Sequence, residues 1–289
     1  MRQNLLSFLI LIAGITTCNS LMGQGIEDIV KNRNNSAYEK KITFERKPAP
    51  LPGVREADVM WSKTVWRLID LREKMNQPLY FPTQEVQGRT NLFNLLIKGI
   101  KDNTITAFEA PIQDDNEFAK PISYDQIRAI FGSSTQQHRN LATGQMESTI
   151  VQNEIVPEEV KQLYIKEVWY FDKQKSSMQV RILGICPIRV FYRDDDKNVE
   201  HKNKLFWVYY PEVRTLLAKN ESLNSRNGAR NFSFDDLFLM RHFDGYISKE
   251  ENDYNNRDIL SYASGEYAAK ESERIKNAIF DYEQDLWEY

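Results

Sequence analysis

The sequence predicts an α+β protein in which a small antiparallel meander, over about residues 163–210, packs with flanking helices and follows a long N-terminal arm. Three observations predict this class. Aromatic and β-branched residues gather in three runs, 168–171, 180–186 and 205–210. Polar segments separate the runs and predict hairpin turns at 172–176 and 193–203. Stretches with a helical period lie on both sides of the meander.

Residues 1–23 have the pattern of a secretory signal peptide. Arg2 provides a positive start, residues 5–15 form an apolar run, and small or polar residues follow, so we predict cleavage at the end of this segment. Acylation of Cys18 is the alternative, although the residues before it differ from those of a lipoprotein signal. After cleavage Cys186 is the only cysteine, and no intramolecular disulfide can form. No later segment approaches the roughly 20 apolar residues of a transmembrane helix, so we expect an exported, soluble protein.

Residues 24–54 are predicted to form an extended, proline-containing arm. Pro48, Pro50 and Pro52 fix the backbone φ angle and remove hydrogen-bond donors, which disfavours helix and central strand. Such an arm either extends freely or binds a neighbouring subunit. The three prolines are therefore candidate partner contacts.

Residues 55–131 are predicted to be mainly helical. Over 55–76, Trp61, Val65 and Leu68 fall on one face of a helix, and Trp66 widens its apolar side. The two tryptophans either pack inside their own domain or meet another subunit, so both are candidate partner contacts. The shorter elements expected in this region are a helix at 91–100, a strand at 104–108 and a helix at 123–131.

Residues 132–153 are rich in Ser, Thr, Gln and Asn and have no apolar periodicity, which predicts a polar loop or linker. A domain boundary, if the chain has one, is expected here. Residues 154–289 are then predicted to be a C-terminal α+β region. It contains the meander, a helix at 211–218, a helix that starts at Ser233 and a terminal helix over 266–286.

The charge and the motifs of the chain give little support to nucleic-acid binding, metal binding or catalysis. Lys and Arg number 38 against 41 Asp and Glu, for a net charge of −3, and no basic patch stands out, so nucleic acid is not an expected partner. His138, His201, His242 and Cys186 have no metal-ligand spacing. Phosphate-binding and nucleophile-elbow motifs are absent from the sequence. We predict no catalytic residue, no cofactor and no metal site, and the many tyrosines and tryptophans favour a dense core or protein interfaces.

Short distinctive motifs extend over nearly the whole chain after the predicted signal peptide. They are Asp58-Val59-Met60-Trp61, Leu79-Tyr80-Phe81-Pro82, Glu167-Val168-Trp169-Tyr170-Phe171, Arg181-Ile182-Leu183-Gly184-Ile185-Cys186-Pro187, Leu205-Phe206-Trp207-Val208-Tyr209-Tyr210-Pro211-Glu212, Ser233-Phe234-Asp235-Asp236-Leu237-Phe238, Glu273-Arg274-Ile275-Lys276 and Asp285-Leu286-Trp287-Glu288-Tyr289. Taken together, these motifs resemble the GldN/PorN family of Bacteroidota.

The resemblance implies a non-enzymatic structural subunit of the periplasmic ring of the type IX protein secretion system, which serves cargo export and gliding motility. The partners it implies are a GldK/PorK-like outer-membrane lipoprotein, further copies of the chain in the ring, and a GldL/GldM-like motor complex nearby. The chain would then lie in the periplasm and be attached to the outer membrane only through the lipoprotein.

Two further expectations concern individual residues. Trp287 and Tyr289 at the aromatic end of the chain are candidate partner contacts, or else fold back on their own domain. The alternative function is a periplasmic ligand-binding protein or enzyme that uses a cleft beside the meander. In that case His242, Asp244 and further carboxylates would converge on one pocket.

Overall fold

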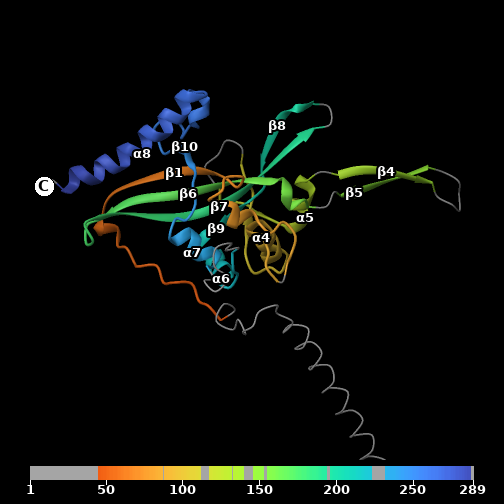
Figure 1. Ribbon diagram of the computed structural model, residues 1–289, viewed down its shortest axis with the longest axis horizontal. Helices are drawn as coiled ribbons and strands as arrows, with labels where there is room; N and C mark the ends of the chain where they lie inside the picture. The colour runs from red at the N-terminus through yellow and green to blue at the C-terminus, as the bar shows by residue number, and fades with distance from the viewer. Residues whose placement is uncertain are drawn as a thin grey trace, which may run out of the picture. The chain divides into compact units, whose positions relative to one another are not determined.

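One antiparallel sheet forms the centre of the protein. The computed structural model describes residues 45–86, 88–111, 117–131, 133–139, 146–152, 155–193, 196–222 and 232–287, so the predicted signal peptide and residues 24–44 of the predicted arm lie outside the described residues. Residues 45–289 make one compact unit. Within its described part, the sheet strands are, in order, β10 (Tyr246–Glu250), β1 (Val59–Asp70), β6 (Val160–Asp172), β7 (Ser177–Arg193), β9 (Trp207–Tyr209), β2 (Ala107–Phe108) and β3 (Pro121–Ile122), with β8 (Asp196–Lys204) beside β7 (Figure 1). Together with the helices below, the sheet confirms the predicted α+β class.

The predicted meander is confirmed at β6 and β7. These strands pair along almost their whole length and are joined by the turn at 173–176. The third predicted strand is shorter than expected: β9 pairs with Gly184 and Ile185 of β7. The segment 193–203 is mostly strand β8 instead of the predicted turn, and that prediction was wrong. Charged residues are normal on an edge strand, where they oppose pairing with other molecules, so charge alone does not indicate a turn.

Strand β1 occupies most of the segment that we predicted as a helix at 55–76, so that prediction was wrong. β1 pairs with β6 along its length and with β10 through residues 65–68. The run from Val65 to Ile69 is buried without interruption. Because neighbours cover both faces of this strand, its apolar residues do not alternate, and their spacing imitates a helical period.

A separate two-stranded sheet stands where we predicted a polar loop over 132–153, and that prediction was also wrong. Strands β4 (Ser133–Arg139) and β5 (Met146–Gln152) pair from Ser133 opposite Gln152 to Arg139 opposite Met146. Strands from before and after this hairpin belong to the same main sheet. The hairpin's polar composition gives no alternating apolar signal by which a strand could be recognised.

The predicted helices after the arm are confirmed except for the one at 55–76. Within the described residues the helices are α3 (Gln77–Tyr80), α4 (Leu92–Lys101), α5 (Tyr124–Ile130), α6 (Tyr210–Ala218), α7 (Phe234–Leu239) and α8 (Glu266–Trp287). Ser123 and Ser233 cap α5 and α7 with reciprocal side-chain and backbone hydrogen bonds, because each accepts from the third helical amide. Among the described residues, no helix combines the length and the apolar character needed to cross a membrane.

The buried side chains form three clusters. The largest joins the sheet to α4, α5, α6 and α7 and includes Leu96, Phe206 and Phe234. A second contains Trp66, Tyr164, Cys186 and Trp207, with Phe108 and Phe118 packed against it. The third joins Val65 and Ile247 of the sheet to Ile275 and Ile279 of α8. Figure 1 shows α8 along the β10 side of the sheet and α4, α6 and α7 on the other side.

Candidate interaction surfaces

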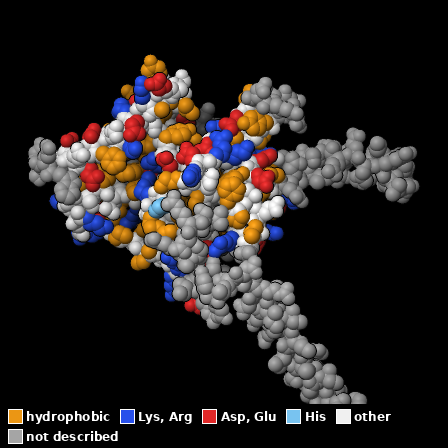
Figure 2. All heavy atoms as spheres, in the orientation of Figure 1, with side chains coloured by type: hydrophobic (Ala, Val, Ile, Leu, Met, Phe, Trp, Pro, Cys, Tyr) orange, Lys and Arg blue, Asp and Glu red, His pale blue; other side chains and the backbone are white. Residues whose placement is uncertain are grey.

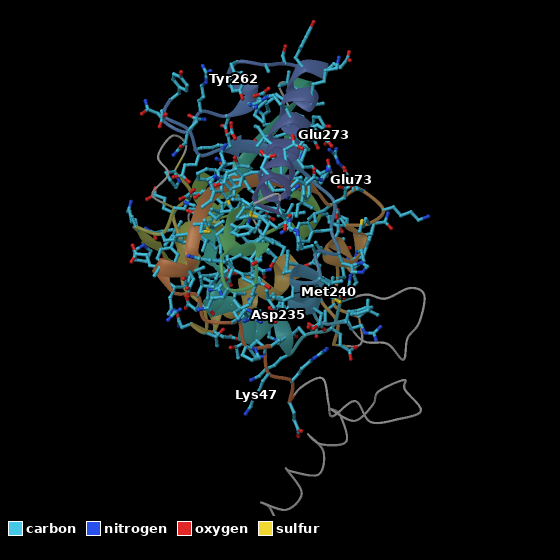
Figure 3. The ribbon with its side chains drawn as sticks, turned by 90° about the vertical axis from the view of Figure 1, so that its left-hand side faces the viewer. Lys47, Glu73, Asp235, Met240, Tyr262 and Glu273 are labelled. Carbon is cyan, nitrogen blue, oxygen red and sulfur yellow. The ribbon has the colours of Figure 1, made fainter. Side chains whose placement is uncertain are left out.

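The described part of the arm lies against its own domain. A guanidinium N–H of Arg214 donates to the carbonyl of Ala49 at 2.6 Å, and Arg181 donates to the carbonyl of Pro52. Arg46 pairs with Asp236 of α7 at 2.9 Å. Figure 3 views this end of the molecule, with Lys47 of the arm and Asp235 of α7 labelled. Two backbone carbonyls and the Arg46 side chain therefore hold the arm, while a partner role for Pro48, Pro50 and Pro52 stays a prediction.

A buried network links the arm to α6 and α7. Asp235 accepts hydrogen bonds from Nε and Nη2 of Arg214, both at 3.0 Å, and from the Tyr210 hydroxyl at 2.8 Å. Burial opposes a charge on Arg214, but the hydrogen bonds and charge of Asp235 outweigh it, so the pKa of Arg214 lies above its ordinary value. Burial also raises the pKa of Tyr210. The network therefore stabilises the packing of the arm on α6 and α7 and is not an exposed contact.

Trp61 and Trp66 lie in different surroundings. Trp66 is only 2% exposed, its Nε1 donates to Glu117 at 2.7 Å, and the ammonium groups of Lys166 and Lys249 lie 4.9 and 4.5 Å from its ring. Trp66 therefore packs inside its own domain, and a partner role for it stays a prediction. Trp61 is half-buried and stacks on Tyr282 of α8 at a centroid distance of 4.9 Å.

Glu167 is a buried charge that sequence reasoning missed. Its carboxylate is fully buried and accepts from Arg241 at 3.0 and 3.2 Å, from Arg67 at 3.5 Å and from the Trp169 indole at 3.1 Å. Burial, together with the like charge of Arg67, holds the pKa of Arg241 below its ordinary value in spite of Glu167. These contacts hold β1, β6 and the segment after α7 together. No local sequence pattern predicts them, because the residues that take part are far apart in the chain.

The residues proposed for the alternative function lie on the surface, outside two pockets that the structure describes. His242 and Asp244 are both exposed. They line neither the groove formed by residues 262–274 nor the pocket beside α4 and α5. Cys186 is fully buried, which raises the pKa of its thiol to about 12. His201 lies in β8, and the side chain of His138 is outside the described part. Across the described ranges, no cluster of His, Cys, Asp or Glu could hold a metal ion.

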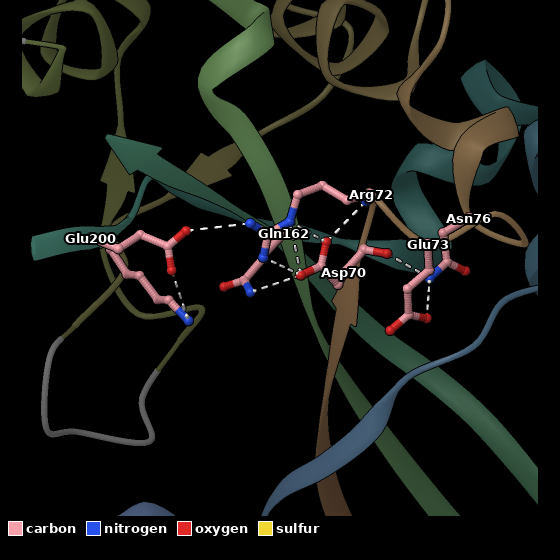
Figure 4. A network of polar contacts seen from close by, with 7 residues as sticks. Asp70, Arg72, Glu73, Asn76, Gln162 and Glu200 are labelled. Atoms are coloured by element: carbon pink, nitrogen blue, oxygen red, sulfur yellow. Dashed lines mark hydrogen bonds and ion pairs between the residues drawn. The ribbon is translucent and has the colours of Figure 1, made fainter. Parts of the chain in front are cut away.

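Polar contacts also stabilise the end of β1, as Figure 4 shows. Arg72 donates from Nε to Asp70 at 2.9 Å and reaches Glu200 of β8 at 3.4 Å, while Gln162 donates to Asp70 at 3.4 Å. Burial alone would raise the pKa of Asp70, but the hydrogen bonds from Arg72 outweigh it and hold that pKa below the ordinary value. Over the face shown in Figure 2, acidic and basic side chains are interspersed with hydrophobic ones.

Comparison with known proteins identifies the family. A family model described as gliding motility associated protein GldN matches residues 54–288, which include the whole main sheet and α8. The chain belongs to the GldN family. No curated protein matches it. As a GldN protein it is associated with gliding motility, and GldN is not a known family of enzymes.

The end of α8 holds the remaining candidate contacts of this GldN protein. Trp287 is the last residue of α8, but its side chain and the whole of Tyr289 lie outside the described residues. Ile275 and Ile279 bury one face of the helix against the sheet. Leu286 is half-buried and Asp285 is exposed, so the described part of this end is open to solvent on at least one side. The partner role of Trp287 and Tyr289 stays a prediction.

Proposed function

We propose that this GldN protein is a non-enzymatic structural subunit of the periplasmic ring of the type IX protein secretion system. The family match over residues 54–288, with its link to gliding motility, is the observation that carries the proposal. In this role the protein supports cargo export and gliding. The ligand-binding or enzymatic alternative stays a prediction, which the exposed His242 and Asp244 do not favour, since they line neither the groove at 262–274 nor the pocket at 100–125.

The partners in this proposal are a GldK/PorK-like outer-membrane lipoprotein, further copies of the chain, and a GldL/GldM-like motor complex. The lipoprotein supplies the attachment to the outer membrane, and the signal-peptide pattern of residues 1–23 supports a periplasmic location. A ring of identical subunits needs two different complementary surfaces on each copy, since each copy contacts two neighbours in the same sense.

Co-purification from membranes tests the proposal. We expect the protein to sediment in a large complex with the lipoprotein, and detergent to release both together. We also expect deletion of its gene to stop cargo secretion, and a plasmid copy to restore it. A protein that stayed monomeric alone and with the lipoprotein, in cells whose secretion survived the deletion, would refute the proposal.

A further inference from the structure

The segment between β10 and α8, together with the first turn of α8, exposes a group of tyrosines, which we call the tyrosine patch: Tyr254, Tyr262 and Tyr267. Tyr254 is 70% exposed and Tyr267 is 75% exposed. The guanidinium of Arg257 lies 5.2 Å from the Tyr254 ring centroid and 4.4 Å from that of Tyr262, and therefore links these two rings. Tyrosine and arginine are enriched in protein interfaces, where they supply much of the binding energy.

The tyrosine patch borders an open groove. Tyr262, Tyr267, Lys270 and Arg274 line this groove, which has a volume of about 620 Å³. Lys270 pairs with Glu266 at 2.7 Å and Arg274 with Glu271 at 2.7 Å. Arg257 differs from them, because it has no ion pair with any residue that the structure describes. The patch thus carries a positive charge, held between aromatic rings, that an acidic and aromatic segment could neutralise.

Hydrogen bonds hold the loop of the patch in one shape. The backbone N–H of Asn252 donates to the side chain of Asn256 at 2.8 Å, and the N–H of Tyr254 donates to the side chain of Asn252 at 3.0 Å. A surface that is already ordered loses less conformational entropy when a partner binds. These hydrogen bonds therefore order the loop that carries Tyr254 and Arg257.

The chain itself contains a segment of the matching chemistry. Residues 285–289 read Asp-Leu-Trp-Glu-Tyr, with two carboxylates, two aromatic rings and a leucine. Aromatic rings can pack on the tyrosines, and Asp285 or Glu288 can pair with Arg257. The charges of the two surfaces are complementary.

The same copy cannot bring these two surfaces together. The tyrosine patch lies at the beginning of α8, and the acidic segment begins in the last turn of this 22-residue helix. At a rise of 1.5 Å per residue, the helix separates Tyr267 from Asp285 by about 27 Å. Only residues 288 and 289 follow the helix, and two residues can reach only about 7 Å from its end. Figure 1 shows the two ends of α8 apart, and Figure 3 shows Tyr262 near one end with Glu273 further along.

We propose that residues 285–289 of one copy bind the tyrosine patch and groove of the next copy. This contact joins two different surfaces, so it repeats head to tail, as the neighbours in a ring require. The proposal rests on the proposed function in one respect: it takes the two copies to be neighbours in the ring. It assigns a counterpart to Trp287 and Tyr289 that the sequence could not supply.

Cysteine cross-linking tests the contact and its direction. In the full chain with Cys18→Ser, Tyr267→Cys is combined with Trp287→Cys, and the protein is oxidised with and without the lipoprotein. We expect a ladder of covalent dimers, trimers and larger species from the double variant and none from either single variant. Glu273→Cys with Trp287→Cys is the matched control, since Glu273 is exposed on the same helix outside the groove. Absence of the ladder, or an equal ladder from the control, would overturn the proposal.

Charge exchange gives a second, independent measurement. Arg257→Glu and Glu288→Lys should each weaken self-association by about tenfold in analytical ultracentrifugation, and the two together should restore it. Lys276→Glu, an exposed charge elsewhere on α8, should change nothing. If the double variant did not recover, the contact would be wrong. A complex with the lipoprotein that persisted in this case would leave the ring function standing, so the two failures can be told apart.

Discussion

Removal of the Asp235 carboxylate should be among the most damaging single changes to this GldN protein. Asp235 is buried and receives three hydrogen bonds, two from Arg214 and one from Tyr210. In Asp235→Ala, the guanidinium of Arg214 stays buried without its counter-charge. The Tyr210 hydroxyl also loses its acceptor.

The expected loss follows from these contacts. Taking away one partner of a buried ion pair costs about 3–5 kcal/mol, because the remaining charge is desolvated and uncompensated. For a domain of this size, each kcal/mol lowers the melting temperature by about 2–4 °C. We therefore expect the melting temperature of Asp235→Ala to fall by about 6–20 °C, measured by circular dichroism, with a matching loss of unfolding free energy in urea.

Two further variants make this reasoning testable. Glu109→Ala removes an exposed carboxylate that pairs with Lys120, and it should change the stability little. Arg214→Met with Asp235→Leu replaces the whole buried pair by apolar side chains and should be more stable than Asp235→Ala alone. A loss below about 1 kcal/mol in Asp235→Ala, or a double variant worse than the single one, would refute the reasoning.

Four other predictions follow from the described contacts. Deletion through residue 53 should lower the melting temperature by several degrees, because it removes the Ala49 carbonyl that accepts from Arg214. Deletion through residue 44 keeps this carbonyl and should not lower the melting temperature, so equal values for the two deletions would contradict the prediction. Trp66→Ala should cost about 3–5 kcal/mol of unfolding free energy in urea, as expected for a large buried side chain. Cys186 should stay unreactive toward a thiol reagent until the protein unfolds, so fast labelling in native buffer would disprove its burial. The pKa of Asp70 in the folded protein lies below its ordinary value of 3.8, so ionised Asp70 stabilises the fold above pH 3.8 and this stabilisation is lost as the pH falls through the folded pKa. In an acid titration, the difference in unfolding free energy between wild type and Asp70→Asn should therefore shrink over that range.

Local signals in the sequence were sufficient for the helices and the central hairpin. Ser123 and Ser233 act as caps through contacts with residues only three positions away, and such contacts can be read from a short stretch of sequence. The strands β6 and β7 are similarly close in sequence and are joined by a polar turn. Prediction succeeded where neighbouring residues decide the structure.

Non-local contacts explain what the sequence did not reveal. The strand identity of β1 depends on pairing with β6, about a hundred residues later, and Val65 to Ile69 look helical without that partner. Glu167 and Asp235 pair with arginines that are distant in the sequence, and the motifs that contain these two acids do not indicate the pairing. Trp66 was a reasonable interface candidate from its position in a predicted helix, but in a strand covered on both faces it is buried. The acidic end of α8 gained a proposed counterpart only when helix length and the tyrosine patch were known.

The separation between β1 and β6 also has a consequence for how the chain folds. The β6–β7 hairpin closes over a short turn, whereas β1 must wait until the residues up to Asp172 are available. During that interval β1 is an unpaired strand with Trp66, Leu68 and Ile69 exposed, and such segments aggregate readily. Lys63 and Arg67 interrupt its apolar run with charge, which opposes that aggregation before the strand reaches its place.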